Sequence, residues 1–290
     1  MSKMENYKKY VGGVVFLVFS LVGLFFGAWV VNSKYEKCAD RFSFINTVFA
    51  CLEEITINKK AYIDLKLNLM SYIETEKKEG RATEVGLFFR DLEAGPTMGI
   101  SDRIDFIPAS LLKLPHILAM LRFSEEEFPN VLSQTLMYDN ENFLENKQEF
   151  SPKEIIKVNT KYTVDELIRR SLNYSDNFAD ELIWNHLKIL GGDYDLVAEI
   201  YRDLGIVNSY NLNSTSIGVK GYNSIFRLLY NSSFLNKDNS EKLLKILSQN
   251  TFEEGLRSGI PKDIKLANKF GERVLSSGEK QLHDCGIVYY

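Results

Sequence analysis

An uncharged run of 21 residues, Val11 to Val31, limits what the amino-terminal part of this chain can fold into. A helix rises about 1.5 Å per residue, so a run of this length can span a hydrocarbon core of about 30 Å. The run is too long for the apolar region of a cleaved signal peptide, and no small-residue cleavage site follows it. We therefore predict an uncleaved transmembrane signal anchor over residues 10–31, preceded by a tail, residues 1–9.

Lysines flank the run on both sides, so the charge bias that orients membrane helices is weak. We expect a cytoplasmic tail because the large domain follows the helix, which places that domain outside the cytoplasm. Residues 32–60 have no clear periodicity and are interpreted as a juxtamembrane segment. Residues 61–290 are long enough to form a domain with a sizeable core.

The composition argues against several function classes. The net charge is −4, which gives no basic face for nucleic acid. The three cysteines, Cys38, Cys51 and Cys285, include no CxxC pair and have no histidine pair nearby, so a zinc site is not expected. Cys38 and Cys51 could pair with each other, and an odd thiol would remain. No aromatic stripe suggests a cofactor. Gly23 and Gly27 form a GxxxG that could favour helix pairing, but glycine is common in spanning helices, so the oligomeric state stays open.

The first part of the domain predicts a helix followed by a β-hairpin. Residues 61–78 are expected to be helical, with Gly80 ending the helix. Four apolar residues recur at helical spacing: Ile63, Leu67, Met70 and Ile73. Leu65, Leu67 and Leu69 also alternate as a strand would, but the length of the segment favours the helix. Residues 85–89 then alternate in polarity, residues 91–96 supply turn chemistry, and a second extended segment follows.

The rest of the domain is predicted to be mainly helical until its last third. Thr163 to Glu166 matches a capping box at the start of one helix, and a further helix follows from Phe178 to about Leu190. Near the end, residues 263–272 and 282–290 are interpreted as two strands. We therefore expect an α+β domain with a helical middle, in which strands from both ends meet in one antiparallel sheet.

The segment PASLLKLP, residues 108–115, places Ser110 three residues before Lys113. Residues at this spacing lie on the same face of a helix, so the lysine amine could approach the serine hydroxyl. A lysine can act as a base if burial lowers its pKa, and the surrounding residues are apolar. The alternative is an ordinary helix start, because the same pattern recurs at Ser277 and Lys280.

Two further motifs follow in order. Ser175-Asp176-Asn177 ends one predicted helix, and Lys269-Phe270-Gly271 is predicted to end a strand near the carboxyl end of the chain. Each motif is weak by itself, since looser matches occur elsewhere. Their order, spacing and structural setting carry the signal, because a serine nucleophile needs both a base and groups that stabilise charge.

With these three motifs the sequence resembles the class A β-lactamases and the related penicillin-binding proteins, whose signature is S-x-x-K, S-D-N and K-T-G. The resemblance covers roughly Leu65 to Tyr290. It includes the phrases FFRDLEAG, YTVDELIRRSLNYSDNFADELI and GLRSGIPKDIKLANKFG around the motifs. It implies a β-lactamase or transpeptidase-like fold, an acyl-enzyme mechanism, and β-lactams or D-alanyl peptides as small-molecule substrates.

The resemblance also implies roles for individual residues. Ser110 would be the acylated nucleophile and Lys113 its activating partner, while Ser175 would pass a proton to the leaving nitrogen. Asn177 would bind the acyl side chain and help to hold Lys113, and Lys269 would attract the substrate carboxylate. The backbone N–H groups of Ser110 and Glu272 would form the oxyanion hole. Gly271 would be needed because the substrate lies close to that strand.

The sequence departs from the family pattern at three points. Phe270 replaces the hydroxyl residue of K-T-G, which contacts the substrate carboxylate in the family. Residues 200–240, where class A enzymes carry the glutamate that activates the deacylating water, contain no glutamate and only two acidic residues, Asp203 and Asp238. The resemblance also implies one more strand and a closing helix beyond Tyr290.

Two functions remain open at this stage. The retained motif residues favour a serine hydrolase of the β-lactamase or D-alanyl-peptidase type that releases its acyl group slowly. The second hypothesis is a catalytically weak module that binds cell-wall peptide beside the membrane. The three histidines, His116, His186 and His283, are interpreted as surface or packed residues rather than as catalytic bases.

Overall fold

The computed structural model describes residues 27, 29–30, 33, 59–92, 96–139, 150–192, 195–203 and 216–290. The chain divides into two units, residues 1–64 with 93–96 and residues 65–92 with 97–290. The predicted anchor at residues 10–31, apart from residues 27, 29 and 30, and the cysteines Cys38 and Cys51 lie outside the described residues. No helix in the described ranges combines the length and the apolar character of a membrane span.

The first long helix, α3 (Lys59–Lys78), confirms the prediction for this segment. The chain leaves the helix at Gly80, whose φ of +72° is left-handed and therefore suits glycine. Of the four apolar residues that recur at helical spacing, only Ile73 is buried. The other three positions are exposed: Ile63, Leu67 and Met70. Other apolar residues of the helix lie on different faces, so the apolar residues do not form one continuous stripe.

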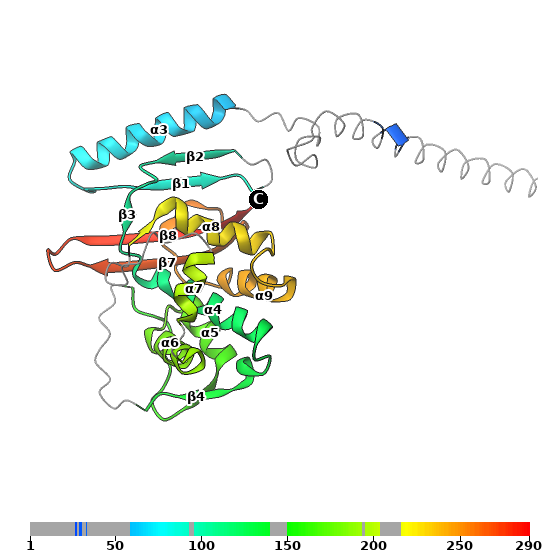
Figure 1. The fold of residues 1–290 in the computed structure, drawn as a ribbon. Coiled ribbons are helices and arrows are strands. Elements are labelled where there is room, and N and C mark those ends of the chain that lie inside the picture. Colours follow the sequence, from blue (N-terminus) through cyan, green and yellow to red (C-terminus); the bar gives the residue numbers. More distant parts are fainter. Residues whose placement is uncertain are drawn as a thin grey trace, which may run out of the picture. The chain divides into compact units, whose positions relative to one another are not determined.

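The second unit contains short strands around a helical middle (Figure 1). The short strands are β1 (Leu87–Arg90), β2 (Thr97–Ile100), β3 (Asp105–Phe106), β4 (Thr135–Met137), β5 (Lys161–Thr163) and β6 (Ile217–Gly218). The long strands are β7 (Lys265–Val274) and β8 (Lys280–Tyr289). Three short 3₁₀ helices are η1 (Ala109–Leu112), η2 (Val131–Ser133) and η3 (Gly255–Gly259).

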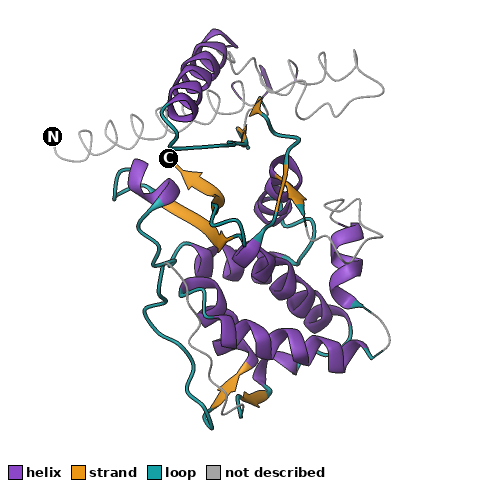
Figure 2. Cartoon of the chain, turned by 90° about the vertical axis from the view of Figure 1, so that its left-hand side faces the viewer, coloured by secondary structure: helices purple, strands orange, loops and turns teal. Residues whose placement is uncertain are grey.

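The helices of the second unit pack against one another and form most of its core (Figure 2). They are α4 (Lys113–Glu126), α5 (Val164–Asn173), α6 (Asn177–Gly191), α7 (Leu196–Asp203), α8 (Val219–Tyr230) and α9 (Lys237–Leu247). Fully buried apolar side chains of α4, α5 and α6 meet here, among them Ile117, Leu167 and Ile183. The long hairpin contributes Ala267 and Ile287 to the same core. The predicted α+β class with a helical middle is confirmed.

The strands pair differently from the prediction. In the described ranges they form four two-stranded antiparallel sheets: β1 with β2, β3 with β6, β4 with β5, and β7 with β8. The predicted hairpin is therefore present as β1 and β2, but the single sheet built from both ends of the domain is not. Alternating polarity indicates which residues are extended, whereas it does not determine which strand edges hydrogen-bond.

Two local predictions also change in detail. Thr163 caps α5, since its hydroxyl accepts the backbone N–H of Glu166 at 3.1 Å. The Glu166 carboxylate does not complete a capping box but binds Arg169 and Arg170 on the same helix, both at 2.8 Å. The motif Lys269-Phe270-Gly271 lies in the middle of β7 rather than at its end, because β7 extends to Val274.

Candidate active site

Ser110 lies in the first turn of η1, directly before α4, and is half-buried. The residue before it, Ala109, has a φ of +49°, a left-handed conformation that strains a residue with a Cβ atom. The Tyr222 hydroxyl donates to the carbonyl of Leu111 at 2.9 Å and fixes this turn from α8. Within the described part of the chain, the Ser110 hydroxyl makes no hydrogen bond. It is therefore available to a substrate.

Lys113, the first residue of α4, is almost fully buried, with 4% of its surface exposed. Its amine donates to the carbonyl of Ser175 at 2.5 Å and to the Asn177 side-chain oxygen at 2.6 Å, and the Ser175 hydroxyl lies 3.2 Å away. Burial lowers the pKa of this amine to about 8, although the nearby carboxylates of Asp180 and Asp176 oppose the shift. A lysine with this pKa can act as a base in mildly alkaline solution.

Ser175 lies in the tight connection between α5 and α6 and has a φ of +56°. This strained conformation places its hydroxyl between two lysines, because the amine of Lys269 lies 3.0 Å from the same oxygen. Lys269 reaches the hydroxyl from β7, and Lys113 reaches it from α4. Residues from three separate motifs are thus in direct contact around one hydroxyl.

Asp176 holds the connection in place. One carboxylate oxygen accepts the backbone N–H groups of Phe178 and Ala179, at 3.0 Å and 3.2 Å, and so caps α6. The other oxygen accepts the N–H of Ile156 at 2.7 Å, from a loop twenty residues earlier in the chain. Burial raises the pKa of this carboxyl in spite of these bonds. Asp176 therefore supports the position of Ser175 and Asn177 rather than facing a substrate.

Lys269 is completely buried. Its amine donates to Ser175 and to the carbonyl of Phe270 at 2.8 Å, and the ring centre of Phe270 lies 4.4 Å from the nitrogen. Burial, followed by repulsion from Lys113, lowers the pKa of this amine well below its usual value. The two buried lysines therefore disfavour each other's charged forms.

Gly271 fits tightly against the turn that carries Ser110. A Cβ atom at this position would lie 2.7 Å from the Pro108 carbonyl oxygen and 3.2 Å from the Ser110 backbone nitrogen. The sequence led us to expect that the substrate requires this glycine. In the structure, a glycine is required at this position because β7 packs directly against η1. Glu272 follows one residue after this contact. The Glu272 carboxylate accepts the backbone N–H of Phe150 at 2.9 Å.

Phe270 belongs to a cluster of three aromatic rings. Its ring stacks on Phe252, with centres 3.9 Å apart and planes 10° apart, and both side chains are 6% exposed. Phe150 packs edge-on against both rings, with centres 5.0 Å from Phe252 and 6.2 Å from Phe270. The sequence marked Phe270 as a departure from its family, but gave no signal for Phe150 and Phe252.

A second pair of groups lies next to Lys113: His116 was interpreted from the sequence as a surface or packed residue, but its acidic partner was not foreseen. His116, one helical turn after Lys113, contacts the Asp180 carboxylate at 3.1 Å and stacks on Trp184. Although burial alone would raise the pKa of Asp180, His116 beside it holds the pKa below its usual value. The spacing of three residues between Lys113 and His116 was the sequence signal that places His116 on the same helix face as Lys113. His116 is thus a packed histidine with an acidic partner.

Other sites considered from the sequence lie apart from this centre. Ser277 and Lys280 are exposed at the turn between β7 and β8. Asp203, at the end of α7, and Asp238, on α9, are also exposed. In the described ranges, no three His, Cys, Asp or Glu side chains gather closely enough to hold a metal ion. Cys285 is a free thiol whose pKa burial raises to about 12.

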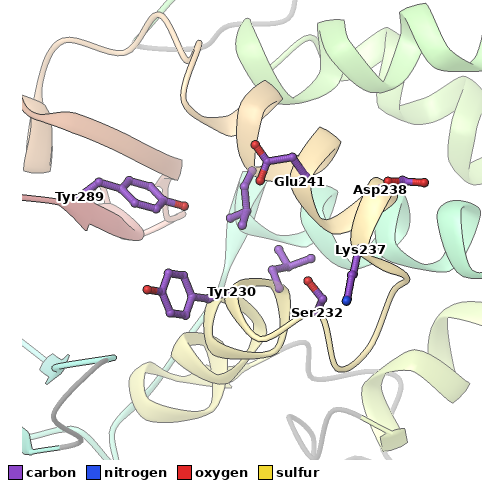
Figure 3. A pocket seen from close by; sticks show the side chains of 8 residues that line it. Tyr230, Ser232, Lys237, Asp238, Glu241 and Tyr289 are labelled. Carbon is purple, nitrogen blue, oxygen red and sulfur yellow. The ribbon is translucent and has the colours of Figure 1, made fainter. Parts of the chain in front are cut away.

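A hollow of about 390 Å³ lies between the end of α8, the start of α9 and the end of β8 (Figure 3). Its lining includes Tyr230, Lys237, Glu241 and Tyr289, which project from these three elements. It shares no residue with the cluster around Ser175. The hollow is therefore separate from the residues that the three sequence motifs bring together.

Comparisons with known proteins agree with this arrangement. A sequence model described as the beta-lactamase enzyme family matches residues 68–290. A comparison with curated protein sequences gave no match. A beta-lactamase from Chitinophaga pinensis is similar in structure, with a TM-score of 0.63 and 22% identity over 76% of this chain and 85% of that one.

Two further solved structures are similar. A class A beta-lactamase from Mycobacterium abscessus gives a TM-score of 0.57 at 22% identity, over 71% of this chain and 79% of that one. PBP-A gives a TM-score of 0.56 at 20% identity, over 71% of this chain and 75% of that one. A variant of PBP-A was solved as an acyl-enzyme complex with penicillin G. At these identities the likeness establishes the fold.

Proposed function

The chain belongs to the beta-lactamase enzyme family, and we propose that it is a serine hydrolase that forms an acyl-enzyme on Ser110 with β-lactams or D-alanyl peptides. The observation that carries this proposal is the contact of Lys113 and Lys269 with one hydroxyl, that of Ser175, beside the turn that bears Ser110. Such a network can accept the proton of a nucleophile and deliver it to a leaving group.

In the proposed reaction the Ser110 oxygen attacks the carbonyl carbon of the substrate amide. The neutral amine of Lys113 takes the hydroxyl proton, either directly once a substrate is bound or through Ser175. The carbon–nitrogen bond then breaks, and the Ser175 hydroxyl passes a proton to the leaving nitrogen. The backbone N–H groups of Ser110 and Glu272 are assigned to the developing oxyanion.

Slow release of the acyl group is part of the proposal. Residues 200–240 supply no glutamate to activate a water molecule, and the two aspartates of that segment, Asp203 and Asp238, are exposed on α7 and α9. Without a positioned base, hydrolysis of the ester on Ser110 proceeds slowly, because general-base catalysis typically contributes about 10²–10⁴-fold.

A second candidate is a binding module on the same fold. It is favoured by Phe270, whose ring closes off the Lys269 amine where a substrate carboxylate would otherwise bind. Ser110→Ala separates the two functions: an enzyme loses its covalent adduct and its turnover, whereas a binding module keeps its affinity for the ligand.

The proposed location is the outer side of a membrane. The support comes from the uncharged run at residues 11–31, which is long enough to anchor the chain and precedes the domain. In this arrangement the tail at residues 1–9 is cytoplasmic, and the domain faces the compartment in which cell-wall peptides are found.

The test is intact-mass spectrometry of the full chain in mild detergent after incubation with benzylpenicillin, with Ser110→Ala alongside. We expect a persistent adduct of one penicillin mass on the wild type and none on the variant. No adduct together with no loss of penicillin would contradict the proposal. Retained binding of the intact drug by both proteins would favour the binding module instead.

A further inference from the structure

In its neutral form the amine of Lys269 has both of its hydrogens bound within the protein. As a neutral amine it has two N–H bonds, and these are used by the Ser175 hydroxyl and the Phe270 carbonyl, at 3.0 Å and 2.8 Å. As an ammonium it has a third N–H, and the Phe270 ring lies 4.4 Å away on the remaining side. The side chain is also fully buried. An anion beside Ser110 therefore cannot reach this cation.

The surface of β7 next to this amine is aromatic rather than polar. Phe270 and Phe252 stack face to face, and Phe150 closes the stack edge-on. A carboxylate placed here would lose its hydration and gain no donor from the rings, which is costly for a charged group. An apolar group would instead bury its surface against the half-buried Phe150, which is favourable.

This aromatic surface lies close to the nucleophile. Gly271 follows Phe270 directly, and its backbone packs against the Pro108 carbonyl and the Ser110 nitrogen. The Phe270 ring also lies 4.4 Å from the Lys269 amine, which donates to Ser175, so a substrate group held beside this cluster would meet the ring. The residue that departs from the family pattern is thus in a position to select the substrate.

The charges around the aromatic surface also disfavour an anion. Asp284 is the cross-strand partner of Phe270, and side chains of such partners lie on the same face of the hairpin. Glu272 lies on this face as well, two residues along β7. Arg273, the next cation on β7 after Lys269, alternates to the opposite face. Apart from Lys269, whose amine is bound within the protein, the charged residues placed on this face, Asp284 and Glu272, are acidic.

We propose that the substrate group seated against Phe270 on β7 is uncharged and apolar, where β-lactams and D-alanyl peptides carry a free carboxylate. The inference rests on the proposed function, in which Ser110 forms an acyl-enzyme, and it specifies the substrate class. The matching substrates are amides or esters in which the carboxyl group that is free in β-lactams and D-alanyl peptides is instead an ester, an amide or a peptide bond to a further residue. The chemical step is unchanged: the bond from Ser110 to the carbonyl carbon forms, the amide or ester bond breaks, and the leaving nitrogen or oxygen takes the proton.

A pair of compounds that differ only in this charge provides the test. The full chain in mild detergent is incubated separately with benzylpenicillin and with benzylpenicillin methyl ester, and the rate of adduct formation on Ser110 is followed by intact mass. We expect the ester to react at least as fast as the free acid. Phe270→Thr, which supplies a hydroxyl donor and removes the ring, should shift the ratio toward the free acid by roughly 10- to 100-fold, the range of a hydrogen bond to a charged group.

Arg273→Ala is the matched variant, and it should leave the ratio unchanged. A wild type that reacts with the free acid tenfold faster than with the ester would overturn the inference while leaving the proposed function intact. A tenfold fall in the ratio of free-acid rate to ester rate in Arg273→Ala would also overturn the inference, because it would show that Arg273 binds the carboxylate. If neither compound labels Ser110, the proposed function itself falls. The wild-type comparison decides the matter even if Phe270→Thr does not fold.

Discussion

Lys113 and Lys269 share one hydroxyl: the Ser175 oxygen lies 3.2 Å from the amine of Lys113 and 3.0 Å from the amine of Lys269. Two buried lysines at this separation disfavour simultaneous charging, and the pKa of each is lowered by burial. The arrangement keeps an amine available as a base without a histidine or a glutamate. It also makes the chemistry of Ser110 sensitive to pH in a defined direction.

The acylation rate of Ser110 should rise with pH. Burial lowers the pKa of Lys113 to about 8, so the neutral, basic form grows about tenfold per pH unit below that value and dominates above it. We expect the rate of adduct formation to increase between pH 6 and 8 and to level off above about pH 9. Lys113→Arg keeps a permanent charge and should abolish both the rise and most of the activity. A flat wild-type profile would show that Lys113 is not the base.

Ser175→Ala should slow acylation by roughly 10²–10⁴-fold, the usual contribution of a positioned proton donor or acceptor. The substitution removes the only hydroxyl that both lysines contact in the described structure. Ser124→Ala is the control, because Ser124 is also buried and donates to a backbone carbonyl, that of Leu121, on α4. The two variants are compared by the rate of adduct formation at one pH. Equal rates would remove Ser175 from the mechanism.

Gly271→Ala should lower both stability and acylation. The added Cβ would lie 2.7 Å from the Pro108 carbonyl oxygen, so either β7 or the Ser110 turn has to move. Overpacking of this kind destabilises by about 1–3 kcal/mol, which lowers the Tm of a domain of this size by a few degrees. Gly259→Ala is the control, since a Cβ there meets nothing within 4 Å. Similar melting temperatures for the two variants would contradict the packing role assigned to Gly271.

Asp284 should make the folded state less stable as the pH rises from 4 to 7. Burial raises the pKa of its carboxyl to about 6, and the usual value is near 3.9. The folded protein therefore binds more protons than the unfolded chain in this interval, and the stabilisation present below pH 4 is lost as the carboxyl ionises through pH 6. The loss is at most about 3 kcal/mol.

Urea unfolding at pH 4.5 and pH 7 measures this effect. The stability of Asp284→Asn relative to the wild type should increase by roughly 2 kcal/mol between the two pH values, because the variant carries no charge at this position. Asp263→Asn controls for the loss of a surface carboxylate just before β7. A constant difference between Asp284→Asn and the wild type would show that Asp284 has no raised pKa in the folded protein.

The sequence predicted the local elements well where one periodicity dominates. The helix that became α3, the hairpin of β1 and β2 and the strands β7 and β8 all follow from spacing and turn residues. Through the resemblance to a known family it also named Lys113, Ser175 and Lys269, which the structure brings into contact, whereas the role of Ser110 stays a prediction. The contact of both lysines with one hydroxyl follows from the fold and could not be derived from spacing alone.

The parts that could not be predicted depend on contacts between distant residues. Phe252 stacks on Phe270 and Phe150 packs edge-on against it, both from other segments of the chain, and no local pattern connects them. The buried carboxylates behave in the same way: Asp180 has a partner on α4, and Asp284 accepts the side-chain amide of Asn268 across the hairpin. Helical spacing can also indicate an apolar face that nothing covers. The apolar residues of α3 recur at helical spacing, yet most of them are exposed.

The close fit of Gly271 against the Ser110 turn has a consequence for local unfolding. A strand and a turn that touch through backbone atoms cannot open separately without breaking that contact, so they belong to one cooperative unit. The amide hydrogens of residues 110–113 and 269–272 should therefore exchange with solvent at the same opening free energy. The turn that carries Ser110 and the strand β7 would then unfold and refold together.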